Sequence, residues 1–171
     1  MTTLILSSSL SPNSKSFMLC KSIEEKLINK NVTCILVDAR KIKAHPYHEE
    51  ITQDMKKLIE QIKEADNLII GMGVHCYSIN DNLKILLDNC FEEAKEKFFG
   101  IMCAAGGQRS YLATQHLTQI CMNEWRMIQL PRIVYAANSE FKKDGKISNE
   151  INERIQKFSE EFYTIGKKLL A

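Results

Sequence analysis

Residues 68–91 read LIIGMGVHCYSINDNLKILLDNCF, and this stretch decides the fold class. It opens with a continuous apolar run at 68–72, which is typical of a strand buried on both faces of a sheet. A short polar loop follows, and apolar residues then return at helical spacing, at Leu83, Leu86, Leu87, Cys90 and Phe91. A strand that leads through a short loop into a helix is half of a βαβ unit. The stretch therefore predicts a parallel sheet with helical crossovers.

The same alternation extends in both directions from this stretch. Strands are predicted near residues 4–6, 32–37, 68–72, 98–103 and 127–135. Helices are predicted near residues 14–29, 55–65, 83–91, 110–120 and 151–169. Parallel strands joined by helices must be covered on both faces, which predicts an α/β fold with a doubly wound five-stranded parallel sheet. The length fits one domain, so residues 1–171 are expected to form a single unit.

Composition excludes several classes of protein. The chain carries 23 basic and 21 acidic side chains, a net charge of +2, and no basic run interleaved with aromatic residues, so no nucleic-acid partner is expected. No stretch reaches the roughly 20 apolar residues of a membrane helix, and the first residues lack the pattern of a signal peptide. The six cysteines form no CxxC pair and are expected to be reduced thiols, mostly in the core. These features predict a cytoplasmic protein with no membrane partner.

The loops after the first, third and fourth strands are the expected functional region. In a doubly wound sheet, ligands bind outside the carboxyl ends of the strands, where the strand order reverses. The first loop, residues 7–16, holds six serine hydroxyls at the start of a helix, where unpaired N–H groups and the helix dipole attract anions. It predicts a phosphate site formed by Ser9, Ser11, Asn13, Ser14 and Ser16. The alternative is a serine-rich turn that caps the helix and binds nothing.

Several other kinds of site find no support in the sequence. No GxxxxGK[ST] is present, which excludes a P-loop nucleotidase, and no GxGxxG follows the first strand, which argues against a dinucleotide fold. The four histidines have no ligand spacing with cysteines or acids, so no metal site is expected. No pair of carboxylates stands out for acid–base chemistry.

The second loop suits a flat heteroaromatic ring with polar edges, because it combines backbone donors with an imidazole and a phenol. Its predicted cofactor contacts are Val74, His75, Cys76, Tyr77 and Ser78. A catalytic Cys–His pair is the alternative, but neighbours in a loop usually point apart and no third group is identifiable that would orient them.

The third loop is rich in small residues. The two glycines at 106 and 107 have no side chains, which allows a ligand to approach the backbone closely. The predicted cofactor contacts of this loop are Gly106, Gly107, Gln108 and Arg109. The alternative is a simple helix entry capped by Ser110.

These motifs resemble those of the NAD(P)H-dependent FMN reductases, a flavodoxin-like family with azoreductase-like, chromate-reductase-like and quinone-reductase-like members. The similarity covers nearly the whole chain in element order. The first loop of the family is roughly G-S-x-R-x-x-S-x-N. Ser9 and Ser14 match it, whereas Ser8 stands in place of the Gly and Ser11 in place of the Arg.

The middle stretch of the family, T-P-x-Y-x-x-S-x-x-x-x-L-K-x-x-L-D, aligns without a gap with residues 72–88. The matching residues are Ser78, Leu83, Lys84, Leu87 and Asp88. Gly73 replaces the Pro and His75 replaces the Tyr, while Tyr77 stands where the family usually has a small residue. The pair at 106–107 matches the Gly-rich turn of the family.

The resemblance implies an FMN-dependent oxidoreductase that passes electrons from NADPH or NADH through FMN to a second acceptor, such as free flavin, a quinone, an azo compound or a metal oxyanion. It implies no catalytic side chain, because the flavin carries the chemistry. It also implies a homodimer or homotetramer. Two alternatives remain: a flavodoxin-type electron carrier, and a degenerate relative that binds FMN without reductase activity. Tyr77 is expected either to restrict bulky acceptors or to pack on a neighbouring element.

Overall fold

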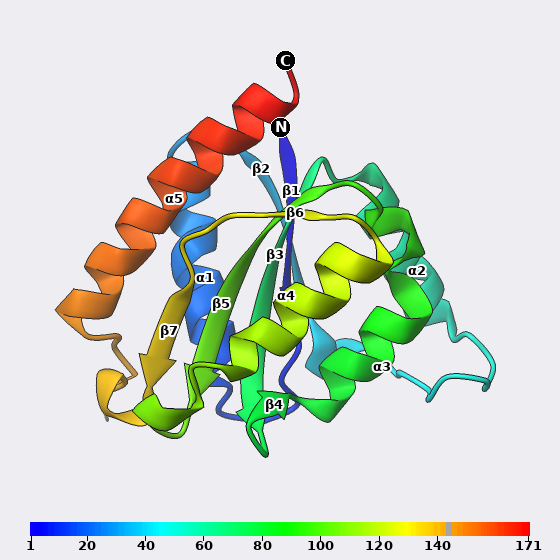
Figure 1. Cartoon of the computed structure of the whole chain (residues 1–171), viewed down its shortest axis with the longest axis horizontal. Helices are drawn as coiled ribbons and strands as arrows, with labels where there is room; N and C mark the ends of the chain where they lie inside the picture. The colour runs from blue at the N-terminus through cyan, green and yellow to red at the C-terminus, as the bar shows by residue number, and fades with distance from the viewer. Residues whose placement is uncertain (143–144) are drawn as a thin grey trace.

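The structure is a computed structural model that describes residues 1–142 and 145–171. Its parallel strands are β1 (Thr2–Ser7), β2 (Thr33–Asp38), β3 (Asn67–His75), β5 (Phe98–Ala105), β6 (Ile128–Gln129) and β7 (Val134–Ala137). They pair in the order β2-β1-β3-β5, with both β6 and β7 beside β5 (Figure 1). The predicted doubly wound flavodoxin-like sheet is confirmed, and the reversal of strand order falls between β1 and β3.

The fifth strand, predicted as one segment near 127–135, is divided into two. β6 pairs with the start of β5 and β7 pairs with its end. Leu130 still donates its N–H to the carbonyl of Phe99 at 2.7 Å. The next residue, Pro131, has no N–H to donate, which interrupts the ladder. The two pieces together form the far edge of a five-stranded core.

Helices cover both faces of this sheet (Figure 1). One face carries α1 (Lys15–Ile28) and α5 (Asn149–Leu169), and the other carries α2 (Gln53–Glu64), α3 (Asp81–Cys90) and α4 (Ala113–Glu124). Along β1, Leu4 and Leu6 belong to one apolar core and Ile5 to the other. Successive side chains of a strand point to opposite faces, so a continuous apolar run is required when both faces are covered.

The segment after the third strand differs from the predicted irregular loop. β3 continues to His75 and then folds back through a short antiparallel strand, β4 (Ser78–Ile79). The two turn residues, Cys76 and Tyr77, have φ of 46° and 60°. Positive φ at both central residues is typical of type I′ hairpins, which usually carry Asn-Gly. Because Cys-Tyr lacks that signal, the sequence did not predict the hairpin.

Close packing positions the first helix next to the end of β3. The side chain of Ser14 caps α1 by accepting a hydrogen bond from the N–H of Phe17 at 3.1 Å. Gly71 on β3 permits the approach, because a Cβ there would lie 2.2 Å from the sulfur of Cys20. The expected cap at Ser110 is wrong: this residue ends a 3₁₀ turn, Gln108–Ser110, and α4 starts later without a side-chain cap.

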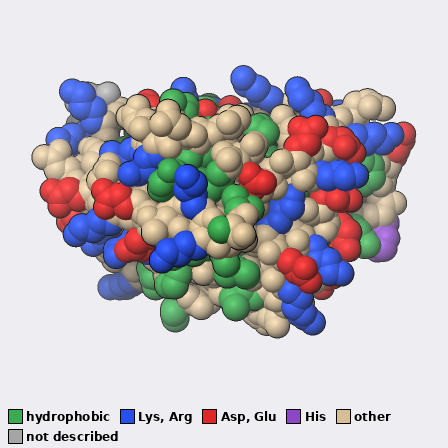
Figure 2. Space-filling model, turned by 90° about the horizontal axis from the view of Figure 1, so that it is seen from above, with side chains coloured by type: hydrophobic (Ala, Val, Ile, Leu, Met, Phe, Trp, Pro, Cys, Tyr) green, Lys and Arg blue, Asp and Glu red, His purple; other side chains and the backbone are tan. Residues whose placement is uncertain are grey.

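The cysteines lie mostly in the core, as predicted, and all six are free thiols. Burial raises the pKa of Cys90, Cys103 and Cys121 to about 12, so these thiols stay protonated near neutral pH. Cys76 is exposed. Basic and acidic side chains are interspersed on the face at the amino ends of the strands (Figure 2), which agrees with the small net charge. No described helix has both the length and the apolar character to cross a membrane.

Candidate functional site

The loops after β1, β3 and β5, together with Asn138 after β7, border an open cavity of about 250 Å³ at the carboxyl end of the sheet, the three-loop cavity. Half of the predicted cofactor contacts line it: Ser9, Ser11, Asn13, Ser16, Val74, His75 and Gly106. The remaining lining residues are Lys15, Gly73, Ala104, Ala105 and Asn138. The cavity lies beside the reversal of strand order, where ligands bind in doubly wound sheets. Segments far apart in the sequence therefore form a single site.

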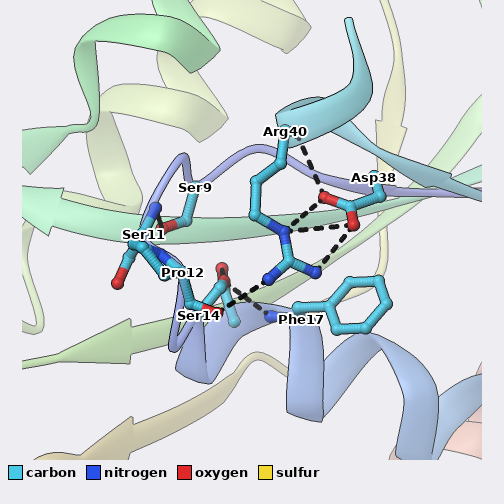
Figure 3. Close-up of polar contacts among 8 residues, drawn as sticks. Ser9, Ser11, Pro12, Ser14, Phe17, Asp38 and Arg40 are labelled. Atoms are coloured by element: carbon cyan, nitrogen blue, oxygen red, sulfur yellow. Dashed lines mark hydrogen bonds and ion pairs between the residues drawn. The ribbon is translucent and has the colours of Figure 1, made fainter.

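The serines of the first loop divide into two kinds (Figure 3). The hydroxyl of Ser14 is committed to the start of α1, and it also lies 3.1 Å from the hydroxyl of the buried Ser16. Ser9 accepts a hydrogen bond from the N–H of Ser11 at 3.3 Å, which shapes the turn. Ser9, Ser11 and Ser16 line the cavity, whereas Ser14 does not. The helix-capping role that the sequence offered as an alternative therefore holds for Ser14.

A cation from outside the loop holds its backbone in place. The guanidinium of Arg40, just after β2, donates to both carboxylate oxygens of Asp38 at 2.7–3.1 Å and to the carbonyl of Pro12 at 2.9 Å. It lies 4.6 Å from the ring centre of Phe17 (Figure 3). The hydrogen bond from Arg40 holds the pKa of Asp38 below its usual range. Arg40 was not among the predicted site residues, although the charged pair Asp38 and Arg40 at the end of the second strand could have indicated it.

Two further polar residues of the cavity were also missed. The ammonium of Lys15 donates to the side-chain oxygen of Asn138 at 2.8 Å and lies 5.3 Å from the ring centre of Phe141. Lys15 belongs to the first loop, where the sequence predicted contacts only from serine hydroxyls and Asn13. Asn138 follows β7, and the loop after the fifth strand carried no motif. Together they place one positive charge at the rim of the cavity.

Most of the hairpin lies outside the cavity. His75 lines it and places its Nδ1 atom 3.5 Å from a carboxylate oxygen of Asp81. Cys76, Tyr77 and Ser78 are absent from the lining, and Tyr77 is 64% exposed at the turn. The adjacent side chains of His75 and Cys76 form no recorded hydrogen bond with each other in the described structure, which leaves the Cys–His catalytic alternative without geometric support.

A larger open groove, about 1300 Å³, lies between α3 and α4. The hydroxyl of Ser78 and the Nδ1 atom of His116 lie 2.9 Å apart at one end of it. This contact ties β4 to α4. The groove is bordered by helix surfaces rather than by the carboxyl ends of the sheet strands, so its position differs from the ligand site expected of this fold.

A buried tyrosine on β7 holds the third loop in place through a hydrogen bond to its backbone. The phenol of Tyr135 on β7 donates to the carbonyl of Gly107, and the ring of Tyr111 packs edge-on against it at 5.3 Å. Burial raises the pKa of Tyr135, so the phenol keeps the proton that it donates at neutral pH. Gly106 lines the cavity, whereas Gly107, Gln108 and Arg109 lie outside it.

Gly73 and Gly106 at the cavity, and Gly107 next to it, serve neither packing nor a left-handed backbone conformation. A Cβ added at Gly73, Gly106 or Gly107 would meet no atom within 4 Å. None of the three has a φ in the left-handed region. Their small size therefore keeps space free over the backbone N–H and C=O groups of two loops. This arrangement suits a flat ligand whose edge hydrogen-bonds to backbone.

The fold is that of a flavodoxin-like α/β protein, with an open cavity at the edge of the sheet where such folds bind ligands. The family model of the NADPH-dependent FMN reductases matches residues 1–142. The chain belongs to the NADPH-dependent FMN reductase family. This membership identifies an oxidoreductase that depends on NAD(P)H and FMN, and it disfavours the electron-carrier alternative.

Known relatives agree with this assignment. The chain is 26% identical over 147 residues to an NAD(P)H-dependent FAD/FMN reductase of Geobacillus thermodenitrificans (strain NG80-2), which covers 80% of each sequence. Its fold is similar to the apo form of NADH:FMN oxidoreductase (EMOB), with a TM-score of 0.81, 15% identity, and coverage of 94% and 87%. It is also similar to FerB, a flavoenzyme NAD(P)H:(acceptor) oxidoreductase from Paracoccus denitrificans, with a TM-score of 0.78, 16% identity, and coverage of 98% and 97%.

Proposed function

We propose that this chain binds FMN in the three-loop cavity and reduces a small-molecule acceptor at the expense of NADPH or NADH. The observation that supports this most directly is the combination of a hydroxyl-rich loop at a helix start with glycines that face open space. Bound FMN would supply the redox chemistry, by taking a hydride from the nicotinamide and passing electrons on. The chain would supply binding, orientation and electrostatics.

The first loop would hold the phosphate of the cofactor. The hydroxyls of Ser9, Ser11 and Ser16 offer donors, and Lys15 offers a positive charge next to the start of α1. Helix starts favour anions, because N–H groups without partners and the helix dipole converge there. Ser11 replaces an Arg of the family motif, so hydroxyls and Lys15 would replace a bidentate guanidinium contact.

The other two loops would hold the flavin ring. Residues 73–75 and 105–106 face the cavity from β3 and β5, and the two glycines leave their backbone accessible. Residues 76–78 and 107–109 would lie farther out, on the path of the nicotinamide or the acceptor. Arg109 could there pair with a phosphate of the nicotinamide cofactor.

A binding experiment tests this proposal without any turnover. Protein mixed with FMN and then desalted should retain flavin absorption, whereas riboflavin, which lacks the phosphate, should be retained far less. Equal retention of the two flavins would contradict the role of the first loop. Loss of both flavins would contradict FMN as the cofactor.

We further propose that residues 1–171 act as one FMN-binding domain in a cytoplasmic homodimer or homotetramer. The family resemblance supports the oligomer, and the reduced cysteines support the compartment. Sedimentation equilibrium at micromolar concentration tests the oligomer, and a purely monomeric protein would contradict it. Fractionation of cells that express the chain tests the compartment.

A further inference from the structure

Asn80 is a buried polar residue to which the proposed function assigns no role. It is 1% exposed and occupies the N-cap position of α3, directly after β4. An asparagine at this position usually accepts a hydrogen bond from the N–H groups of its own helix. Asn80 makes no such cap. Its side-chain amide instead reaches two other segments of the chain.

These contacts join the first loop to the hairpin. The Oδ1 atom of Asn80 accepts from the hydroxyl of Ser8 at 2.8 Å and from the N–H of Gly73 at 3.2 Å. Its Nδ2 atom donates to the carbonyl of Ser8 at 3.1 Å. A flipped amide would set Nδ2 against the N–H of Gly73 and Oδ1 against the carbonyl of Ser8, so the network allows one orientation. Ser8, which is fully buried, also donates its N–H to the carbonyl of Gly71 at 2.9 Å, and its hydroxyl lies 2.8 Å from the same carbonyl.

The two segments that Asn80 joins carry opposite sides of the cavity. Ser9 directly follows Ser8 on the phosphate side, and residues 74–75 directly follow Gly73 on the ring side. A ligand that carries a phosphate at one end and a ring at the other must reach both sides at once. The affinity of such a ligand therefore depends on the distance between the two sides of the cavity. The affinity of a ligand that binds to one side alone does not depend on this distance.

The backbone conformation of the hairpin turn has to be stabilised by contacts with the surrounding structure. Its two turn residues, Cys76 and Tyr77, hold left-handed backbone that is unfavourable for residues other than glycine. Conformations of this kind persist where the surrounding structure imposes them. Asn80 follows the hairpin at once and binds its first strand at Gly73, so it holds both ends of the hairpin together.

We infer that Asn80 is a positioning residue that holds the phosphate loop and the hairpin at the separation that FMN requires, without touching the cofactor. The inference rests on the proposed function, in which FMN occupies this cavity. It goes beyond that function because it predicts that a residue outside the cavity lining determines how the two halves of the site cooperate.

The test compares three ligands on the variant Asn80→Ser, which shortens the side chain but can still cap α3. Affinities for FMN, riboflavin and inorganic phosphate are measured by calorimetry on variant and wild type. We expect at least a tenfold loss for FMN and less than a threefold loss for riboflavin and for phosphate. A folded variant that binds FMN as well as the wild type, or that loses affinity for all three ligands equally, would overturn the inference.

Asn82→Ser is the matched control. Asn82 is also buried and donates to the same carbonyl of Ser8 at 3.2 Å, but within the described residues it forms no hydrogen bond with Gly73. We expect its FMN affinity to stay within threefold of the wild type. A tenfold loss would contradict a specific role of Asn80, because it would show that losing any side-chain contact to Ser8 weakens FMN binding.

A second variant covers the case in which Asn80→Ser does not fold. Ser8→Ala removes the hydroxyl that contacts both the Oδ1 atom of Asn80 and the carbonyl of Gly71. It should lower FMN affinity by about threefold to tenfold, with phosphate and riboflavin unchanged; unchanged FMN affinity would overturn the inference. Wild-type protein that fails to bind FMN would contradict the proposed function itself, whereas wild-type binding with unaffected variants would contradict the role of Asn80 alone.

Discussion

Individual hydroxyl groups form the immediate surface of the proposed phosphate site. Ser9 and Ser11 line the cavity from the turn that they share, and Lys15 provides the nearest cation in the lining. Arg40 lies next to the same loop, but its N–H groups donate hydrogen bonds to Asp38 and to the backbone carbonyl of Pro12. The loop is therefore preorganised by a guanidinium while its binding surface stays neutral and hydroxylic, with one lysine at the rim.

Ser9→Asp would set a carboxylate against the phosphate of FMN. We expect a loss of about 2–3 kcal/mol in binding free energy, because a hydrogen bond to a charged group is lost and like charges are brought together. FMN affinity should fall by roughly 30- to 150-fold, while riboflavin affinity should change little. Fluorescence titration with both flavins measures the ratio. An equal loss for both would locate the phosphate elsewhere.

Tyr77→Gly removes an exposed ring and relieves left-handed backbone at the tip of the hairpin. Stability should stay the same or rise by up to about 1 kcal/mol, since glycine adopts positive φ without steric cost. If Tyr77 restricts acceptors, kcat/KM for a bulky azo dye should rise while that for a small quinone stays constant. Parallel changes for both acceptors, or weaker FMN binding, would show that Tyr77 supports the hairpin instead.

Between elements, the ion pair of Asp38 and Arg40 ties the end of β2 to the first loop. The pKa of Asp38 is lower in the folded protein than in the unfolded chain. The ion pair therefore stabilises the fold at pH above the unfolded-state pKa of roughly 4, and this stabilisation is lost as pH falls through the lower folded-state pKa. Arg40→Met should therefore lower Tm at pH 7, and its difference from the wild type should shrink as pH falls below about 4. A difference independent of pH would assign the effect to packing on Phe17.

At the opposite end of the sheet, Lys97 closes the end of α2. Its ammonium donates to the carbonyls of Ile62, Lys63 and Ala65 at 2.6–2.9 Å. Lys97→Met should destabilise the protein by about 1.5–3 kcal/mol, because three carbonyls lose a charged donor. Urea unfolding measures this loss. FMN affinity should be unchanged, because the site lies at the other end of the strands; a large change would show that the two ends are coupled.

Across the whole molecule, the sequence predicted the layers well because they depend on periodicity. Residues 68–72 form a continuous apolar run and residues 83–91 have apolar side chains at helical spacing, and the structure has a buried strand and a helix there. Features that depend on one donor or on tertiary contacts were missed. Pro131 divides the last strand by lacking an N–H. Arg40 after β2 and Asn138 after β7 contact the first loop from positions that are distant in the sequence.

The structure brings half of the predicted site residues together at one cavity, while their role in binding FMN stays a prediction. The carboxyl ends of parallel strands must meet at one edge, so the three loops could be assigned from the strands alone. Which side chains face the cavity depends on backbone turns. Ser14 turns to its own helix, and the positive φ values at Cys76 and Tyr77 carry residues 76–78 away from the lining.

The most direct test of the central claim is anaerobic reduction of the FMN-loaded protein. NADPH or NADH is added after desalting, and the absorption band of oxidised flavin is followed for minutes. We expect the band to bleach with at least one nucleotide and to return when a quinone is added. A band that persists with both nucleotides, while FMN stays bound, would contradict an NAD(P)H-dependent FMN reductase.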